Sequence, residues 1–367
     1  MKTETKIILS ISIILLTSSF FTSEESSLRY IKYLLLPFML VLVLFHNKVA
    51  VNKILFYNLL LYTFLITLNF LTATITGNLS LRFVTESSLI LVPIITVFLI
   101  FALKNINISK IIDYVFYSYL LSFVIYNFKF LINVPKLFSS FFTALKFSVF
   151  PTESWLAFPF GIFTIYYIIE KKYLTFYISL VLFLLSFKRI AMVALALSLL
   201  VYFFYENKKF IKAKFVRYFI AINLILLTLL YFFINGVFTK FIERETGISI
   251  NWFSQGRFQI YNDVINHFSD KIWLGTSLGF THLYLSTKYT DIAFLHSDIL
   301  KIILELGILP FIIWLFSFMK ININSLKSVA LIMYINILFL SDNVFIYFDT
   351  LFIFYIILIK FDIDERS

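Results

Sequence analysis

Repeated apolar runs of membrane-spanning length constrain this chain more than any other feature of its sequence. Runs of about 17–25 residues recur along the chain, and a helix of that length crosses the roughly 30 Å hydrocarbon core of a bilayer. Inside a bilayer the backbone must satisfy its own hydrogen bonds, which leaves only helices and closed barrels. The runs are continuous rather than alternating, so they favour helices. With 61% hydrophobic and 14% charged residues, the chain is predicted to be an all-α, polytopic integral membrane protein.

We predict twelve transmembrane helices and no separate soluble domain, so that residues 1–367 form a single transmembrane domain. Lys2 and Lys6 precede the first run as in a signal peptide, but no small-residue cleavage site follows. The first run is therefore predicted to be an uncleaved span. The predicted spans are approximately 7–21, 28–45, 54–73, 87–103, 111–132, 154–169, 173–187, 190–205, 215–236, 298–319, 328–341 and 344–360. One long loop, residues 237–297, separates the ninth span from the tenth.

The distribution of Lys and Arg predicts the orientation. With a cytoplasmic N-terminus, the inner segments hold seventeen of the 31 Lys and Arg residues, and the longer outer segments hold twelve. This bias follows the positive-inside rule and places both ends in the cytoplasm. The loop 237–297 and the turn with Lys188 and Arg189 are then extracytoplasmic. The formal net charge of +11 is explained by these short loops and by anionic lipid, and no nucleic-acid partner is expected.

Several kinds of site are excluded or not indicated by the sequence. The chain has no cysteine, which rules out disulfides and thiolate chemistry. Its four histidines are scattered, and no metal-binding, Walker or dinucleotide pattern occurs, so no metal and no cofactor is expected. His46 is predicted in a cytoplasmic loop, and His267 and His282 are interpreted as loop residues.

His296 is the candidate for acid–base chemistry. It precedes Ser297 and Asp298, which resemble the N-cap and first turn of a helix predicted over 298–319. The positive end of that helix disfavours imidazolium, whereas Asp298 favours it. A histidine between such influences can be neutral and accept a proton. An interfacial histidine bonded to backbone is the alternative.

Two arginines are candidates for binding an anion. Arg189 lies at the outer end of an apolar helix, where an arginine costs free energy unless it snorkels or finds an anion. Arg257 follows Gly256 and opens a predicted amphipathic helix. The apolar positions of that helix are Phe258, Tyr261, Val264, Ile265 and Phe268. Further along, Lys301 and Glu305 are four residues apart and can pair on one helix face.

Short elements follow one another in a characteristic order over about 150–310. They are Glu153-Ser154, Arg189, Gly256-Arg257, Tyr261, Trp273-Leu274-Gly275 with Gly279, His296 and Glu305-Leu306-Gly307. This order resembles the O-antigen polymerase and O-antigen ligase family of bacterial envelope enzymes. The chain departs from the family pattern at Ser277, Ser297 and Pro310, where Gly, Asn and Gly are more usual. The remaining spans match only in hydropathy.

The resemblance implies a bacterial polysaccharide polymerase of the O-antigen or capsule type. Family members transfer a glycan from an undecaprenyl-diphosphate carrier to a sugar hydroxyl, without a required metal. The resemblance implies His296 as general base and Arg189 and Arg257 as clamps on the diphosphate. Implied partners are the lipid-linked oligosaccharide, membrane lipids, a chain-length regulator and a flippase. The protein would lie in the cytoplasmic membrane, with its active site facing the periplasm or cell exterior.

Two other functions stay open at this point. A ligase of the same family would move finished glycan to another lipid or to a protein. A lipid-glycan flippase or secondary transporter would carry internal repeats and ionisable residues near the bilayer midplane. No convincing repeat is found here, and most ionisable side chains lie toward the outer ends of the predicted spans.

Overall fold

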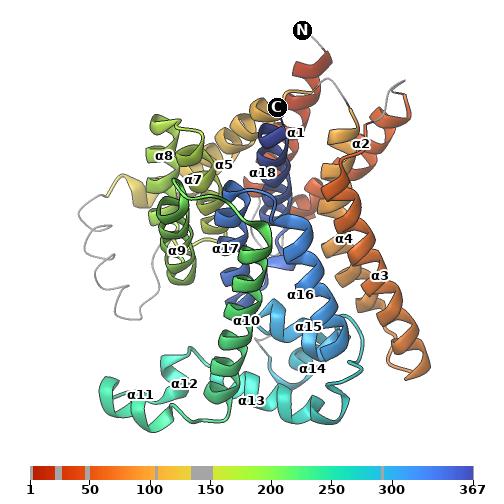
Figure 1. Ribbon diagram of the computed structural model, residues 1–367, viewed down its shortest axis with the longest axis vertical. Helices are drawn as coiled ribbons and strands as arrows, with labels where there is room; N and C mark the ends of the chain where they lie inside the picture. Colours follow the sequence, from red (N-terminus) through yellow and green to blue (C-terminus); the bar gives the residue numbers. More distant parts are fainter. Residues whose placement is uncertain are drawn as a thin grey trace.

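The structure is a computed structural model, and it describes residues 3–20, 27–45, 50–103, 106–133, 152–290 and 293–366. Every element in these ranges is a helix, so the prediction of an all-α fold is confirmed. His46 lies outside the described residues. The two termini lie at one end of the molecule, and the helices built from residues 239–288 lie at the other (Figure 1).

The helices follow one another with short connections. In chain order they are α1 (Thr3–Phe20), η1 (Ser27–Leu34), α2 (Leu35–Leu44), α3 (Lys53–Ile75), α4 (Leu81–Ala102), α5 (Ile108–Leu131), α7 (Ala157–Ile169), α8 (Tyr173–Leu185), α9 (Arg189–Tyr205), α10 (Lys212–Ile234), α11 (Thr239–Thr246), α12 (Ile250–Phe253), α13 (Arg257–Phe268), η2 (Ser269–Lys271), α14 (Phe280–Lys288), α15 (Asp298–Leu306), α16 (Ile308–Asn322), α17 (Leu326–Ser341), η3 (Val344–Ile346) and α18 (Phe348–Arg366).

The twelve predicted spans all fall on helices, but the number of membrane crossings is not confirmed. Within the described residues, α3, α4, α5 and α10 are the four helices long and apolar enough to cross a membrane by length and composition. Other apolar helices are shorter; α7 has 13 residues and α9 has 17. At 1.5 Å per residue these are about 20 and 25 Å long, less than the hydrocarbon core.

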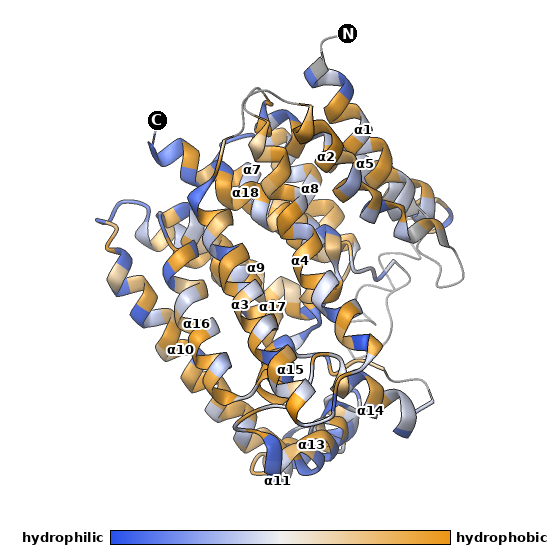
Figure 2. Cartoon of the chain, turned by 90° about the vertical axis from the view of Figure 1, so that its right-hand side faces the viewer, coloured by the Kyte–Doolittle hydropathy of each residue, from blue (hydrophilic) through white to orange (hydrophobic). Residues whose placement is uncertain are grey.

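The core of the molecule is built from α7, α17 and α18. Helix α18 occupies the centre of the bundle (Figure 1), where it contacts α4, α7 and α17. Every residue from Phe348 to Ile359 is buried, so this part of the helix is surrounded by protein on all sides. Helix α10 differs, because only Phe215, Phe219, Asn223 and Ile234 of its 23 residues are buried. The long helices are mostly apolar along their length, and polar residues gather near the C-terminus and around α11 (Figure 2).

The predicted single helix over 298–319 is wrong, because the chain breaks between α15 and α16. Gly307 has φ 100° and ψ 164°, a conformation that is essentially restricted to glycine. The Gly275 turn packs directly against this break. A side-chain carbon at Gly307 would come within 2.5 Å of the Trp273 carbonyl oxygen, and one at Gly275 within 2.4 Å of the Leu306 carbonyl carbon.

The same turn binds the backbone groups that the helix break exposes. Thr276 N donates to Glu305 O (2.9 Å), and Ile308 N donates to Ile272 O (3.0 Å). These bonds pair backbone groups that the helix break leaves outside the regular helical pattern. The Trp-Leu-Gly and Glu-Leu-Gly elements of the sequence are therefore the two halves of one backbone contact.

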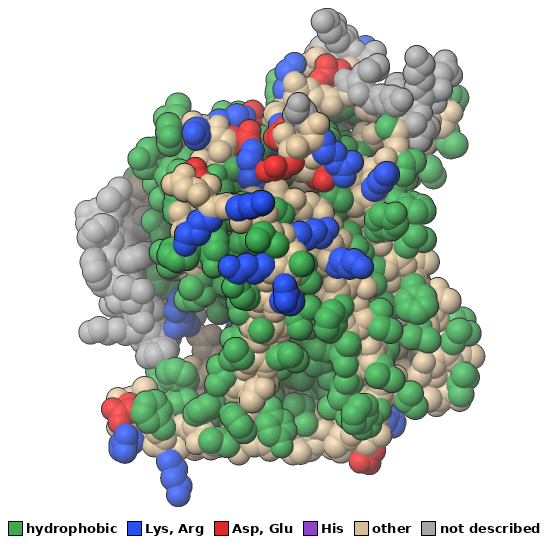
Figure 3. Space-filling view, viewed as in Figure 1, with side chains coloured by type: hydrophobic (Ala, Val, Ile, Leu, Met, Phe, Trp, Pro, Cys, Tyr) green, Lys and Arg blue, Asp and Glu red, His purple; other side chains and the backbone are tan. Residues whose placement is uncertain are grey.

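Basic side chains are unevenly spread over the surface. On the face shown in Figure 3, Lys and Arg gather on the upper half, toward the termini, and the lower half is mainly apolar down to the end that carries α11 and α12. This distribution agrees with the charge bias read from the sequence. Which end of the molecule faces the cytoplasm stays a prediction.

Candidate active site

Arg189 and Arg257 line one pocket of about 550 Å³. Arg189 is the first residue of α9 and Arg257 the first residue of α13, so the fold brings together two helix starts that are far apart in the sequence. Both arginines are half-buried. A hollow between α9, α10 and α12 is visible at the lower left of Figure 3. We call the pocket lined by Arg189 and Arg257 the arginine pocket. The structure thus brings together two side chains that were predicted to share one site.

A second pair of charges lies at the rim of the arginine pocket. Lys188 Nζ is 2.9 Å from Glu153 Oε1, and both side chains line the pocket. Glu153 belongs to the Glu-Ser element of the sequence, and Ser154 N donates to Ser186 O (3.0 Å). The Glu-Ser element therefore joins the end of α8 to the pocket. Its carboxylate neutralises one of the three cations there.

Helix α13 carries Arg257 and packs as an amphipathic helix. Its buried residues include Tyr261, Val264 and Phe268, three of the predicted apolar positions. They join a small cluster with residues of α10 and α15. Burial raises the pKa of Tyr261 to about 12, with Arg257 lowering it and Asp342 raising it. The Tyr261 hydroxyl therefore keeps its proton at neutral pH and can act as a donor.

His296 does not line the arginine pocket, but it contacts two residues that do. Tyr261 Oη donates to the His296 carbonyl oxygen (2.8 Å). His296 Nδ1 lies 3.8 Å from Asp342 Oδ1, which is longer than a hydrogen bond and within reach of an ion pair. Nδ1 is buried, although 42% of the side chain is exposed. His296 also has φ 53°, a strained value for a residue other than glycine.

Asp342, rather than Asp298, is the acidic neighbour of the His296 ring. It directly follows α17 and is buried. Burial raises the pKa of its carboxyl. His296 and the Asn343 N–H together lower this pKa by more, so that it lies below its ordinary value. Asp342 is therefore ionised at neutral pH. The predicted partner, Asp298, instead accepts a hydrogen bond from Phe345 N (3.0 Å).

The start of α15 is otherwise as predicted. Ser297 is the N-cap, and its Oγ accepts a hydrogen bond from Leu300 N (3.2 Å). Asp298 N donates to the Asp342 carbonyl oxygen (3.2 Å). The segment from His296 to Asp298 is thus bound to the turn between α17 and α18 by its backbone as well as by its side chains.

An apolar groove continues from the arginine pocket along α10. The groove is lined by Leu226, Leu229, Leu230, Phe233, Phe238, Phe241, Ile242 and Leu340. Three of these residues, Leu230, Phe233 and Leu340, line the arginine pocket as well. The groove and the pocket therefore adjoin each other. The arginines lie at the pocket side, and aliphatic and aromatic side chains line the groove.

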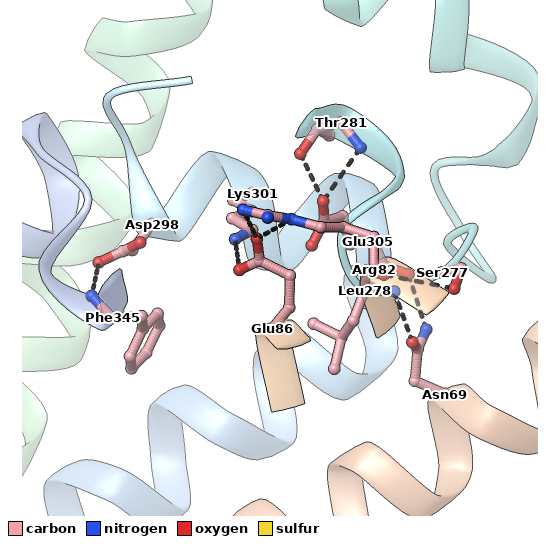
Figure 4. Close-up of polar contacts among 10 residues, drawn as sticks. All are labelled: Asn69, Arg82, Glu86, Ser277, Leu278, Thr281, Asp298, Lys301, Glu305 and Phe345. Carbon is pink, nitrogen blue, oxygen red and sulfur yellow. Dashed lines mark hydrogen bonds and ion pairs between the residues drawn. The ribbon is translucent and has the colours of Figure 1, made fainter. Parts of the chain in front are cut away.

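A second cluster of charges lies deeper in the protein and joins α4 to α15 (Figure 4). Glu86 accepts from Arg82 Nε (2.9 Å) and from Lys301 Nζ (2.6 Å). The expected pairing of Lys301 with Glu305 along one helix is replaced by this contact with α4. Glu86 is 1% exposed, so both cations are needed to offset its desolvation.

Glu305 is held by groups from other elements. Its carboxylate accepts from the backbone N–H (3.1 Å) and hydroxyl of Thr281. Its carbonyl oxygen accepts from Asn69 Nδ2 (2.8 Å), and Asn69 Oδ1 accepts from Leu278 N (2.9 Å). Figure 4 shows how these contacts draw α3, α14 and α15 together. The Glu-Leu-Gly element therefore fixes the position of α15, whose first turn follows His296.

This cluster includes a broken helix and buried ionisable groups, which are also common in transporters. It lies where α4 begins, since Arg82 is the second residue of that helix. That end of α4 faces the α11–α14 end of the molecule (Figure 1). Across the described residues, no group of three or more His, Cys, Asp or Glu side chains is placed to hold a metal ion.

The other two described histidines are helical, which corrects their interpretation as loop residues. His267 lies in α13 and stacks on Tyr284, with ring centroids 4.1 Å apart. His282 lies in α14. Burial lowers the pKa of His282, and the nearby Arg82 lowers it further.

Three residues that contact the candidate site or its supporting helices were missed from the sequence. Asp342 stands alone in the short turn between two apolar runs, and that isolation was its only signal. Arg82 and Glu86 are four residues apart at the start of an apolar helix, a pattern that predicts a local ion pair. Their contact with Lys301 depends on the packing of α4 against α15 and has no signature in the sequence.

Comparison with known proteins gives one result. Residues 174–315 match the family model described as O-antigen ligase. The matched segment runs from α8 to α16 and contains Arg189, Arg257 and His296. No curated protein matches the chain, and no solved structure does. The predicted resemblance to the O-antigen polymerase and O-antigen ligase family is therefore confirmed over residues 174–315.

Proposed function

We propose that this protein is a polysaccharide polymerase of the O-antigen or capsule type. Its donor is a glycan on undecaprenyl diphosphate, and its acceptor is a sugar hydroxyl of another lipid-linked repeat unit. The observation that carries the proposal is the meeting of Arg189 and Arg257 in one pocket whose wall contacts His296. The family match over the same segment supports it.

The proposed chemistry is a single displacement at the anomeric carbon. The acceptor hydroxyl attacks that carbon and gives its proton to Nε2 of His296, because Nδ1 faces Asp342. The bond between the anomeric carbon and the phosphate oxygen breaks, and its electron pair leaves with the diphosphate. Arg189 and Arg257 stabilise the charge that develops there, since a guanidinium fork matches phosphate oxygens better than an ammonium does.

Asp342 and Tyr261 are proposed as positioning residues. The ionised Asp342 carboxylate faces Nδ1, and the Tyr261 hydroxyl holds the His296 carbonyl. Such neighbours fix the orientation of a catalytic imidazole and stabilise the imidazolium that forms on proton transfer. The apolar groove along α10 offers a place for the isoprenoid chain of the donor next to the arginines.

We further propose that the site faces the periplasm or the cell exterior and that the reaction needs no metal. A flippase would deliver the donor, and a chain-length regulator would set the size of the product. These assignments follow from the family resemblance and from the charge bias of the sequence.

The proposal is tested first with His296→Ala. Membranes that contain this variant are supplied with carrier-linked repeat units, and polymer is followed as a ladder on a gel. We expect polymer formation to fall by about 10²-fold or more, which is the usual contribution of a general base, at an unchanged amount of inserted protein. Long-chain polymer at the wild-type rate would remove His296 from the mechanism.

The clamp is tested with Arg257→Lys, which keeps the charge and removes the fork. We expect a loss of at least tenfold in the rate at low donor concentration. Arg244→Lys is the matched control, because Arg244 lies on α11, is exposed, and pairs with the adjacent Glu245. Equal rates for the two variants would argue against a clamp.

A ligase is the second candidate, because the matching family model is described as O-antigen ligase. Carrier-linked repeat units supplied alone separate the two functions. A polymerase elongates them unaided, whereas a ligase needs a different acceptor.

A further inference from the structure

A second hollow, of about 350 Å³, adjoins the arginine pocket. It is lined by Ser249, Asn251, Trp252, Gln255 and Gly256, and none of these residues is charged. Gln255 lines the arginine pocket too. The two hollows therefore lie on either side of Gln255 and are next to each other on the surface.

The lining of this hollow has a specific chemical character. It contains two amides, one hydroxyl and one indole, and the Trp252 side chain is exposed (59%). The Asn251 amide already bonds Gln259 through Nδ2 and Oδ1 (3.3 Å each), and each of these two atoms keeps one further hydrogen-bonding position. Amides and hydroxyls donate and accept hydrogen bonds without charge. The indole provides a flat apolar face with one polar edge. A sugar ring matches this set, because it has hydroxyls around its edge and an apolar face of C–H groups.

The backbone fixes the hollow in place. Gln255 and Gly256 have φ 55° and 82°, so two consecutive residues adopt the left-handed conformation between α12 and α13. Gly256 N donates to Asn251 O (2.8 Å), and Gln255 N donates to Trp252 O (3.1 Å). A strained conformation at a residue other than glycine is maintained only when surrounding contacts require it. Here it fixes the turn in which Gln255 and Gly256 precede Arg257.

Three neighbouring surfaces of different chemical character share lining residues. The apolar groove shares Leu230, Phe233 and Leu340 with the arginine pocket, and the arginine pocket shares Gln255 with the uncharged polar hollow. A lipid-linked saccharide has three parts with the same characters in the same order: hydrocarbon, diphosphate and sugar. This match in order supports a sugar as the occupant of the third surface.

We infer that the segment Ser249–Gly256 is a saccharide subsite, with an uncharged sugar ring stacked on Trp252 and bound by Asn251 and Gln255. The inference rests on the proposed function for its neighbour, the diphosphate clamp. The sugar comes either from the donor, next to the diphosphate, or from the acceptor chain. The two sources share one chemistry at this surface.

Equilibrium binding tests the subsite. The probe is the lipid-free repeat-unit oligosaccharide released by mild acid from the carrier-linked intermediates of the host cell, labelled at its reducing end. Purified full-length protein in detergent should bind it about tenfold more weakly after Trp252→Ala. Trp252→Phe, which keeps an aromatic face, should restore most of the affinity. Gln255→Ala should weaken binding severalfold.

Trp273→Ala is the matched control, since Trp273 is also an exposed tryptophan (63%) and does not line the hollow. It should bind the oligosaccharide as the wild type does. Unchanged affinity in Trp252→Ala, or an equal loss in Trp273→Ala, would overturn the subsite.

Transfer assays separate the subsite from the proposed function and identify the source of the sugar. His296→Ala should lose transfer and keep oligosaccharide binding; if it keeps transfer, the polymerase mechanism fails while the binding result stands. The source of the sugar is then found with the free oligosaccharide as acceptor and the carrier-linked unit as donor. A KM of the oligosaccharide that rises in Trp252→Ala assigns the sugar to the acceptor, and a rise in the KM of the carrier-linked unit alone assigns it to the donor. Wild-type KM values for both substrates in Trp252→Ala overturn the inference.

Discussion

At the scale of single residues, the contact between His296 and Asp342 gives the sharpest expectation. Asp342→Asn keeps the shape of the side chain and removes the charge that faces Nδ1. We expect the rate of glycan transfer to fall about 10–100-fold, as is usual when the group behind a functional imidazole is changed. Initial rates with carrier-linked substrate and purified protein measure this. A rate equal to that of the wild type would rule out a positioning role.

The same residue gives a dependence on pH. The pKa of Asp342 lies below its ordinary value, about 3.9 for an aspartate, so the carboxylate stays ionised between pH 5 and 8. The loss of rate in Asp342→Asn should therefore persist across that range, measured as the initial rate of each protein at each pH. The stability that the ionised group contributes is present above the unfolded pKa and is lost only as the pH falls through the lower folded pKa. Asp263→Asn is the control, because the Asp263 carboxylate lies on α13 and pairs with Lys288 (2.9 Å) outside the pocket.

Sequence alone was informative about the residues with strong local signals. His296 and the two arginines lie at helix starts, and their features follow from neighbouring residues. Asp342 has none, because its role depends on the turn after α17 lying beside the start of α15. Contacts between distant segments are set by packing, and one sequence without its fold does not contain them.

At the scale of helices, the break at Gly307 is the feature with the largest expected effect. Gly307→Ala would place a carbon 2.5 Å from the Trp273 carbonyl oxygen and would strain the backbone. We expect the free energy of unfolding to fall by more than the about 1–3 kcal/mol that such a conformation costs by itself. The midpoint of thermal unfolding in detergent reports this change.

Gly247→Ala is the control for that variant. Gly247 also has a positive φ, 71°, but nothing lies within 4 Å of an added carbon. The midpoint of thermal unfolding of Gly247→Ala should therefore fall only by the effect of the strained backbone. Comparable midpoints for the two variants would mean that the close contact between the two glycine turns is not required.

Helix positions were predictable, and helix continuity was not. Apolar runs and capping residues such as Ser297 mark where helices form, and α13 has its predicted apolar face. The break between α15 and α16 was missed because Leu306, Gly307 and Ile308 continue an apolar run. Only the packing of the Gly275 turn against Gly307 makes the break necessary.

At the scale of the whole molecule, the orientation in the membrane is directly testable because the chain contains no cysteine. Lys240 on α11 and Lys209 after α9 are both exposed and lie in segments predicted on opposite sides. In intact cells, a membrane-impermeant maleimide should label Lys240→Cys. Lys209→Cys should be labelled only after the membrane is opened. The reverse pattern would invert the predicted topology and exclude an extracytoplasmic site.

The whole-molecule prediction was right about class and incomplete about architecture. Hydropathy identifies an all-helical membrane protein, since burial in lipid and burial in protein both require apolar helices. Hydropathy does not distinguish burial in lipid from burial in protein. Helices α7, α17 and α18 are apolar because protein surrounds them, whereas α10 is apolar with few buried residues. The count of crossings could not be read from hydropathy for this reason.

The arginine pocket is a hollow at the surface rather than an enclosed chamber (Figure 3). An enclosed site would limit its product to whatever length its volume could hold. Under the proposed polymerase function, only the sugars nearest the reacting carbon would touch an open site, and the older part of the chain would extend into the aqueous phase. Polymer size would then depend on how often the growing end dissociates before the next addition, and a chain-length regulator would act by changing this ratio of rates.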